Sequence, residues 1–286
     1  MVQILQLDLN LLTFVNNQLD LLINQKGGFL TSFFFIYNTM DKQLEIYGIR
    51  SIIEAIESSK EISRVYLIKS NSHQSGLFKS LVSLLESNNI KYSFVPKEKF
   101  KKYINKNHQG AVAILSPIKL LSIDELVETT FNDSSPKTYL LLDGVTDTRN
   151  FGAIIRTAVG ANVDGIIIPQ NNSAPVNSDV VKTSSGGVFK IPIARVSNIK
   201  DAILHLNSLN IDIISLSEKG KKTIYESNFK KSVAIIMGSE EKGISKSILN
   251  LSNSILKVPI SSKIDSLNVS VAFSAVVFEI IRQRNF

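Results

Sequence analysis

A polar loop that could form a reactive site lies within the stretch from Leu141 to Pro169. The stretch runs from an apolar segment through the loop into a helical pattern and a second apolar segment. This is the order of a nucleotide-binding βαβ unit. The glycines of a phosphate-binding G-x-G-x-x-G turn are missing. The loop instead holds Asn150, and Arg156 follows six residues later, which indicates a ligand other than a dinucleotide phosphate.

Two further polar loops follow apolar segments, at Met237–Ser245 and Val258–Ala272. Ligands of open α/β sheets bind at the carboxyl ends of the strands, so three such loops fit one shared site. Each loop also has a purely structural interpretation. Asn150 could start a helix, the loop glycines could shape turns, and Ser266 could cap the last helix with Asn268 in its first turn.

The composition is that of a folded, basic protein. Of 286 residues, 44% are hydrophobic and 20% are charged, and the net charge is +7. An excess of positive charge favours a polyanionic partner, such as nucleic acid or an anionic membrane surface. The chain has no cysteine and three histidines far apart in the sequence, which excludes disulfides and cysteine metal sites. We therefore expect no catalytic metal.

Residues 1–39 differ from the rest, because they carry only three charges and are rich in leucine, asparagine and phenylalanine. They lack the basic start and cleavage site of a signal peptide. Their longest uncharged apolar run is too short for a membrane span, which needs about 20 residues. We expect a non-domain N-terminal extension, a first domain that starts at Met40, and no membrane partner.

The remaining chain divides into two α/β regions. Residues 40–118 alternate short strands and amphipathic helices. Residues 119–136 form a linker that begins with a helical pattern, which Ser122 could cap, and Asn132–Pro136 is the expected domain boundary. From residue 137 to residue 286, strands alternate with helices, and several strands are continuous apolar runs. Such runs predict a parallel sheet covered by helices on both faces.

Three motifs occur in a fixed order: NFGAIIRTA from Asn150, GSEEKG from Gly238 and SLNVSVA from Ser266. Together they resemble the SPOUT superfamily of RNA methyltransferases, in its TrmH/SpoU-like branch that methylates ribose 2′-hydroxyls. IYGIRSIIEAI and HQGAVA in the first region resemble the L30e-like RNA substrate-binding domain of the bacterial 23S rRNA guanosine 2′-O-methyltransferases. This resemblance implies a deep trefoil knot in the C-terminal domain, S-adenosylmethionine as methyl donor, a homodimer and a cytoplasmic enzyme that acts on 23S rRNA.

The resemblance also assigns site residues. Five side chains would form the catalytic site: Arg156, Asn150, Glu240, Ser266 and Asn268. Three residues would hold the donor through main-chain groups: Gly238, Val258 and Leu267. A guanidinium stays protonated to pH ~12 or above, so Arg156 suits phosphate binding and alkoxide stabilisation better than proton removal. The structural alternative for Arg156 is a solvent-facing helix arginine in a salt bridge.

The sequence departs from the branch at three positions: Thr148 replaces a proline, Glu241 a glycine and Asp265 a small residue. None of these changes removes a site side chain, so we expect an active enzyme. Three other functions remain open: a tRNA 2′-O-methyltransferase, a non-catalytic RNA-binding ribosome-assembly factor and a nicotinamide-dependent enzyme. The missing glycine fingerprint argues against the last of these.

A cluster of lysines precedes the turn at Asn107–Gly110: Lys97, Lys99, Lys101, Lys102 and Lys106. Phe100 and Tyr103 lie among these lysines, and His108 lies in the turn. Lysines could bind RNA phosphates while an aromatic ring stacks on an unpaired base. The alternative is a solvated helix face, which is common for lysine runs. For His108 we expect a role in the turn or an RNA contact.

Overall fold

The computed structural model describes residues 44–69, 76–115, 118–131 and 133–286. The expected N-terminal extension and the expected domain start at Met40 lie outside these residues. None of the helices within the described ranges has the length and apolar character needed to cross a membrane.

The first region folds around a small mixed sheet. Within the described residues its strands are β1 (Leu44–Tyr47), β2 (Ile62–Ile68), β3 (Tyr92–Val95) and β4 (Ala111–Leu115), in the order β1-β4-β2-β3. The strands β2 and β3 are parallel, and β4 is antiparallel to both β1 and β2. The helices are α3 (Ile49–Glu57) and α4 (Gly76–Ser87), with the 3-10 helix η1 (Lys97–Tyr103). Ile49, Ile52 and Ile56 of α3 are buried in the core.

The second region is built on a sheet of seven strands in the described part of the chain, in the order β7-β6-β5-β10-β8-β11-β9. The strands are β5 (Thr138–Asp143), β6 (Gly165–Pro169), β7 (Ile193–Val196), β8 (Asp212–Leu216), β9 (Lys222–Thr223), β10 (Val233–Gly238) and β11 (Ser254–Lys257). Every pair of neighbours is parallel. Their carboxyl ends therefore meet at one edge, here called the carboxyl edge.

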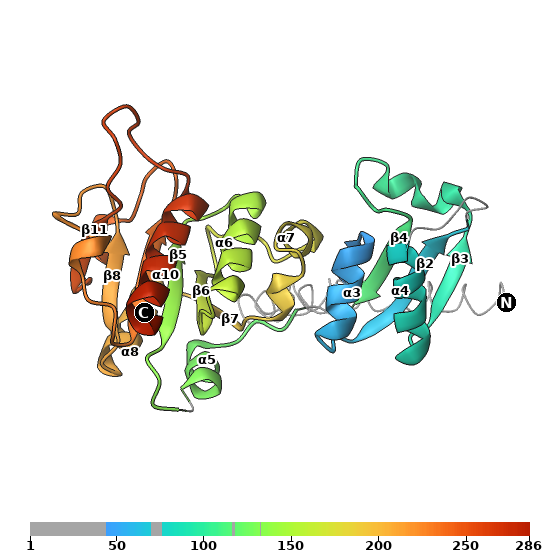
Figure 1. Cartoon of the computed structure of the whole chain (residues 1–286), viewed down its shortest axis with the longest axis horizontal. Helices are drawn as coiled ribbons and strands as arrows, with labels where there is room; N and C mark the ends of the chain where they lie inside the picture. The colour runs from blue at the N-terminus through green and yellow to red at the C-terminus, as the bar shows by residue number, and fades with distance from the viewer. Residues whose placement is uncertain (1–43, 70–75, 116–117, 132) are drawn as a thin grey trace, which may run out of the picture. The chain divides into compact units, whose positions relative to one another are not determined.

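Helices cover both faces of this sheet (Figure 1). They are α5 (Ile123–Thr130), α6 (Thr148–Gly160), α7 (Ser178–Thr183), α8 (Ile199–Ser208), α9 (Lys246–Leu249) and α10 (Val269–Asn285), with short 3-10 helices η2 (Gly187–Phe189) and η3 (Ile224–Glu226). Leu140 and Leu142 of β5 join one core cluster with α6 and α10. Tyr139 and Leu141 join the other cluster with α8. The prediction of a doubly covered parallel sheet is confirmed.

The helix expected in the linker segment is α5, with Ser122 as its cap. The Ser122 hydroxyl accepts the backbone N–H of Glu125 while the Glu125 carboxylate accepts the N–H of Ser122, a capping box that starts the helix. Leu126 is fully buried, and it fills the space that a side chain at Gly165 would need. The helix α5 therefore packs on the large sheet, and the exposed stretch 133–136 follows it. The domain boundary itself stays a prediction.

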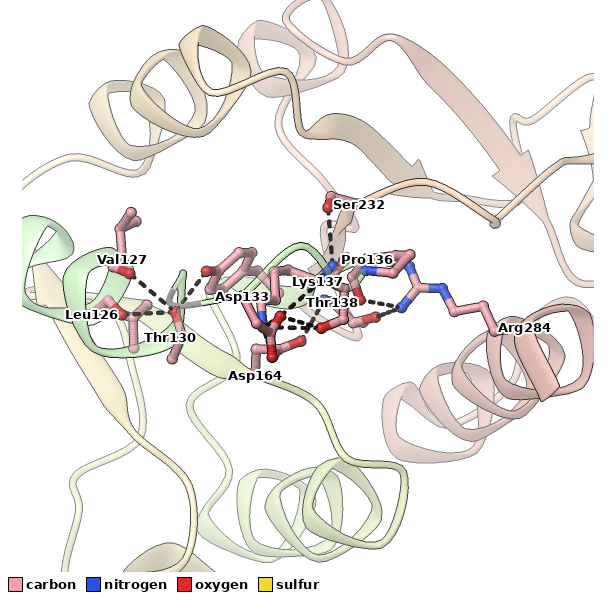
Figure 2. A network of polar contacts seen from close by, with 12 residues as sticks. Leu126, Val127, Thr130, Asp133, Pro136, Lys137, Thr138, Asp164, Ser232 and Arg284 are labelled. Atoms are coloured by element: carbon pink, nitrogen blue, oxygen red, sulfur yellow. Dashed lines mark hydrogen bonds and ion pairs between the residues drawn. The ribbon is translucent and has the colours of Figure 1, made fainter.

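Arg284 near the end of α10 binds the opposite, amino edge of the large sheet (Figure 2). Its Nε donates to the carbonyl of Phe229, and Nη1 donates to the carbonyl of Pro136 and the hydroxyl of Thr138. Its Nη2 donates to the carbonyls of Lys137 and Lys231. All five N–H groups of the guanidinium thus have oxygen partners, so Arg284 fixes the last helix to the sheet.

Candidate active site

The three polar loops meet at the carboxyl edge. Gly238, the last residue of β10, pairs in register with Asp143, the last residue of β5, so the loops after these strands are neighbours. A cleft of ≈ 620 Å³ lies across the ends of β8, β10 and β11 and the start of α10. It is lined by six of the predicted site residues: Gly238, Glu240, Val258, Ser266, Leu267 and Asn268.

Three side chains from the three motifs form a closed hydrogen-bonded cluster. The Asn150 amide donates to Glu240 Oε1 at 2.8 Å. The Asn268 amide donates to the same Glu240 oxygen at 2.7 Å and to Asn150 Oδ1 at 3.0 Å. Asn150 and Glu240 are 90 positions apart, and Asn268 is 118 positions from Asn150. The folded sheet therefore brings together three polar residues that the sequence widely separates.

Helix caps place two members of this cluster. The Asp147 carboxylate accepts the backbone N–H groups of Arg149 and Asn150, which fixes the first turn of α6. Asn268 is the N-cap of α10, and its side chain accepts the backbone N–H of Ser270. The structural alternative that gave this cap to Ser266 is therefore wrong. An asparagine amide can accept through its oxygen and donate through its nitrogen, so Asn268 can cap the helix and join the cluster.

A second cleft of ≈ 310 Å³ adjoins the first. It is lined by residues after β5, among them Thr146, Asp147 and Asn150, and by Asn172. Both clefts share the wall Ser239–Lys242, and Glu240 stands in that wall. The Asn150–Glu240–Asn268 cluster therefore lies at the boundary between two cavities, as required of groups that act between two ligands.

Arg156 and Ser266 lie outside this cluster. Arg156 is exposed on α6, lines neither cleft, and makes no hydrogen bond or ion pair with the residues that the structure describes. The salt bridge of its structural alternative is therefore not formed with any described residue. Ser266 lines the larger cleft but has no hydrogen-bond partner among the described residues.

Gly238 is required by the fold of its own loop. A Cβ atom there would lie 2.2 Å from the carbonyl carbon of Gly243 and 2.4 Å from the backbone nitrogen of Ile244. Backbone atoms cannot approach so closely, so any side chain at this position would push the loop out of place. Gly243 itself has a φ of 62°, a left-handed conformation that favours glycine.

One part of the larger cleft was absent from the sequence prediction. Leu216, the last residue of β8, and the residues Ser217–Lys219 after it line the cleft beside the two predicted loops. The signal was present, because an apolar strand is followed by the polar pair Glu218 and Lys219. The position of β8 between β10 and β11 in the sheet was not predictable from the sequence.

The lysine cluster of the first region is partly neutralised. Lys102 pairs with Glu45 at 2.6 Å and Lys106 pairs with Asp179 at 2.7 Å. Hydrogen bonding to Lys106 and Tyr47 lowers the pKa of Asp179, and the hydrogen bond to Asp179 raises the pKa of Lys106. Lys97, Lys99 and Lys101 have no such partners among the described residues, so their charges are not neutralised by ion pairs there.

The ring of Phe100 is buried and packs against His108, so Phe100 is not an aromatic that could stack on RNA. The Tyr103 hydroxyl donates to Glu45, which holds that ring in place. His108 Nδ1 accepts the backbone N–H of Gly110, as expected for a residue that shapes the turn. Burial lowers the pKa of His108, and the positive charges of Lys182 and Lys97 lower it further.

Comparison with known families matches both regions. Residues 137–278 match the SpoU rRNA methylase family. Residues 46–121 match the RNA 2′-O ribose methyltransferase substrate-binding domain. The fold and the two matches define an RNA-modifying methyltransferase with a separate substrate-binding domain.

Individual relatives agree. The chain is 30% identical over 245 residues to a Staphylococcus saprophyticus protein named as a TrmH family tRNA/rRNA methyltransferase, covering 86% of this chain and 98% of the relative. It is 36% identical over 178 residues to the 23S rRNA (guanosine-2′-O-)-methyltransferase RlmB of Vibrio vulnificus, covering 62% and 72%. The SpoU methyltransferase AviRb of Streptomyces viridochromogenes, crystallised with AdoMet, shares the fold with a TM-score of 0.71, 20% identity and coverage of 84% and 90%. The chain therefore belongs to the SpoU/TrmH family of RNA ribose 2′-O-methyltransferases.

Proposed function

We propose that the protein transfers a methyl group from S-adenosylmethionine to the ribose 2′-hydroxyl of a guanosine in 23S rRNA. The observation that carries this proposal is the Asn150–Glu240–Asn268 cluster at the boundary of two clefts. A transferase needs two adjoining binding sites with polar groups between them, and the carboxyl edge offers that arrangement.

The larger cleft suits the donor. Its volume of ≈ 620 Å³ falls in the range of roughly 300–1000 Å³ typical of small-molecule sites. Apolar residues such as Leu216 and Val258 line it beside charged residues such as Glu218 and Lys242, which fits a ligand with an adenine ring and a charged amino-acid tail. Gly238, Val258 and Leu267 have unreactive side chains, so we assign them main-chain contacts. The bound donor supplies an electrophilic methyl group on its sulfonium, for which no metal is needed.

The smaller cleft suits the acceptor nucleoside. Asp147, Asn150 and Asn172 line it and offer hydrogen-bonding groups to a ribose and a base. Glu240 faces both clefts, and its Oε1 already accepts two amide N–H groups. The cluster can therefore hold the 2′-hydroxyl in line with the donor methyl group, and Ser266 can add a hydroxyl from the donor side.

Arg156 is proposed to bind the RNA outside the clefts. It follows Asn150 by six helical residues, which places it ~9 Å further along α6. At that distance a guanidinium can bind a phosphate next to the target ribose with two parallel hydrogen bonds. Its exposure and its lack of a partner among the described residues suit a side chain that waits for an RNA anion.

The nature of the RNA rests on the first region and on the relatives. The RlmB relative of Vibrio vulnificus acts on 23S rRNA guanosine, and residues 46–121 match a substrate-binding domain. The alternative substrate is tRNA, since the relative of Staphylococcus saprophyticus carries both RNA classes in its name. We further propose a trefoil knot in the C-terminal domain and a cytoplasmic location.

A homodimer is part of this proposal. Val271 and Phe278 on α10 are 52% and 53% exposed, and Ala275 lies between them on the same helix face. A contiguous apolar face on a soluble protein is typical of an interface. Light scattering at micromolar concentration should give twice the chain mass, and Phe278→Glu should give the monomer. A monomeric wild-type protein would contradict the proposal.

The central test offers 23S rRNA and tRNA, each transcribed without modification, to the protein with isotopically labelled S-adenosylmethionine. Label in 23S rRNA at a guanosine 2′-oxygen is the expected result. Label in tRNA alone would favour the alternative substrate. Donor binding by calorimetry without transfer to either RNA would favour a non-catalytic RNA-binding factor.

A further inference from the structure

The Asn268 amide orients the whole cluster, and Ser270 helps to fix it. Asn268 Oδ1 accepts two hydrogen bonds from Ser270, one from the backbone N–H at 2.9 Å and one from the hydroxyl at 2.6 Å. A backbone N–H can only donate, so the atom that it meets must be the amide oxygen. The amide nitrogen therefore points the other way, toward Glu240 and Asn150.

The orientation of the Asn268 amide decides which atoms of the other two side chains donate and which accept hydrogen bonds. Asn150 Oδ1 accepts from Asn268, so the Asn150 amide nitrogen is free to donate to Glu240 Oε1 at 2.8 Å. If the Asn268 amide turned over, its oxygen would face the Glu240 carboxylate and the Asn150 carbonyl oxygen. Three acceptors would then oppose one another, and the cluster would separate.

We propose that Ser270 is a positioning residue of the methyl-transfer site, which acts by holding the Asn268 amide and through it Glu240 and Asn150. This inference rests on the proposed function. Ser270 itself lines neither cleft, so it does not reach the ligands. Its hydroxyl is the second of two donors on Asn268 Oδ1, and the backbone N–H alone leaves the amide freer to rotate.

The test measures single-turnover methyl transfer and donor affinity for Ser270→Ala and Ser270→Thr. A neutral hydrogen bond contributes about 0.5–1.5 kcal/mol, so Ser270→Ala should slow transfer roughly 3- to 10-fold. Donor affinity should stay at the wild-type value, and the melting temperature should fall by roughly 2–4 °C at most, because the helix cap through the backbone N–H is kept. Ser270→Thr retains the hydroxyl and should restore the wild-type rate.

Ser274 provides the matched control. It lies one turn later in α10, and its hydroxyl donates to the backbone carbonyl of Ser270 rather than to the cluster. Ser274→Ala removes an equal group from the same helix and should leave the transfer rate unchanged. In a protein that already carries Asn268→Ala, the change Ser270→Ala should not slow methyl transfer further, because the amide that Ser270 holds is absent.

Three results would overturn the inference: a wild-type rate in Ser270→Ala, a slow rate in Ser270→Thr, or an undiminished effect of Ser270→Ala in the Asn268→Ala background. A loss of rate that is fully explained by weaker donor binding or by a smaller fraction of folded protein at the assay temperature would overturn it too. Failure of the proposed function is distinguishable, because the wild-type protein itself would then transfer no methyl group to RNA.

Discussion

Two arginines of the large α/β region differ in how fully the fold satisfies their N–H groups. Arg284 at the amino edge donates all five of its N–H groups to oxygens of Phe229, Pro136, Thr138, Lys137 and Lys231. Figure 2 shows Arg284 beside Pro136, Lys137 and Thr138. Arg156, in the second half of α6, is exposed and has no such partner in the part of the chain that the structure describes. The first guanidinium is satisfied within the fold, whereas the second has its donors available for a ligand.

The two edges of the large sheet differ in the same way. Polar groups at the amino edge are paired within the fold, whereas those at the carboxyl edge lie beside clefts. At the amino edge the buried Lys137 pairs with Asp133 at 2.7 Å and with Asp164 at 3.7 Å, and Asp164 accepts the backbone N–H of Thr138. At the carboxyl edge, Asn150, Glu240 and Asn268 bind one another but face two clefts. Polar groups that saturate one another stabilise a fold, while polar groups beside an open cavity can act on a ligand.

The largest effect is expected at the amino edge. Arg284→Ala removes five hydrogen bonds from a charged donor and leaves backbone carbonyls without partners. The free energy of unfolding should fall by roughly 3 kcal/mol, because hydrogen bonds to charged groups contribute about 1.5–3 kcal/mol each and are not additive. Denaturant titration measures this change. Transfer per folded molecule should stay at the wild-type rate, and a specific loss of transfer would break the comparison between the edges.

The second effect concerns Arg156. Arg156→Ala should slow methyl transfer roughly 100-fold or more, the size expected for loss of a charge-stabilising group. Stability and donor affinity should change little, because this side chain has no partner in the described residues and lines neither cleft. Arg156→Lys should restore little of the transfer rate, since an ammonium lacks the planar pair of donors. Single-turnover kinetics beside calorimetric donor titration decide the matter. If transfer stays near normal, Arg156 is a surface residue of the fold.

A smaller effect is expected at Gly238. In Gly238→Ala the new Cβ would meet the backbone of Gly243 at 2.2 Å, so the loop must move. Donor affinity should fall roughly 10-fold, which corresponds to about 1.4 kcal/mol. Gly160→Ala is a suitable control, because nothing lies within 4 Å of a Cβ there. Calorimetric titration of both variants gives the affinities. Unchanged donor affinity in Gly238→Ala would remove Gly238 from the donor site.

The smallest effect is a pH dependence at the amino edge. Hydrogen bonds from Lys137 and Ser135 lower the pKa of Asp133 from 3.8 to about 2. The unfolded state binds this proton more tightly, so Asp133 stabilises the fold above pH 3.8, and that contribution is lost as the pH falls to about 2. Burial raises the pKa of Asp164, so the contribution of Asp164 to stability changes with pH in the opposite direction.

Thermal unfolding between pH 5 and pH 2 checks this prediction. Asp133→Asn should lose stability less steeply than the wild type as the pH falls below about 4, and Ser135→Ala should give an intermediate slope. The effect is small because Asp133 is largely exposed to solvent. Equal slopes in the wild type and Asp133→Asn would show that the ion pair with Lys137 contributes nothing to stability.

Local patterns in the sequence determined the helices and strands and named the candidates for the site. Continuous apolar strands predicted the parallel sheet because strands buried on both faces need apolar residues at every position. Ser122 was identified as a helix cap because capping depends on residues three apart. The resemblance of the three motifs to a known family also singled out Asn150, Glu240 and Asn268, which motifs of local sequence can carry.

Only the tertiary structure decided how these residues meet and which polar groups remain available. The order of β8, β10 and β11 places Leu216–Lys219 in the larger cleft, and strand order depends on contacts between distant parts of the chain. The sequence alone did not show that Phe100 would be buried or that Arg284 would be saturated. Local patterns identify the residues that can bind, but long-range packing determines which of them already have partners.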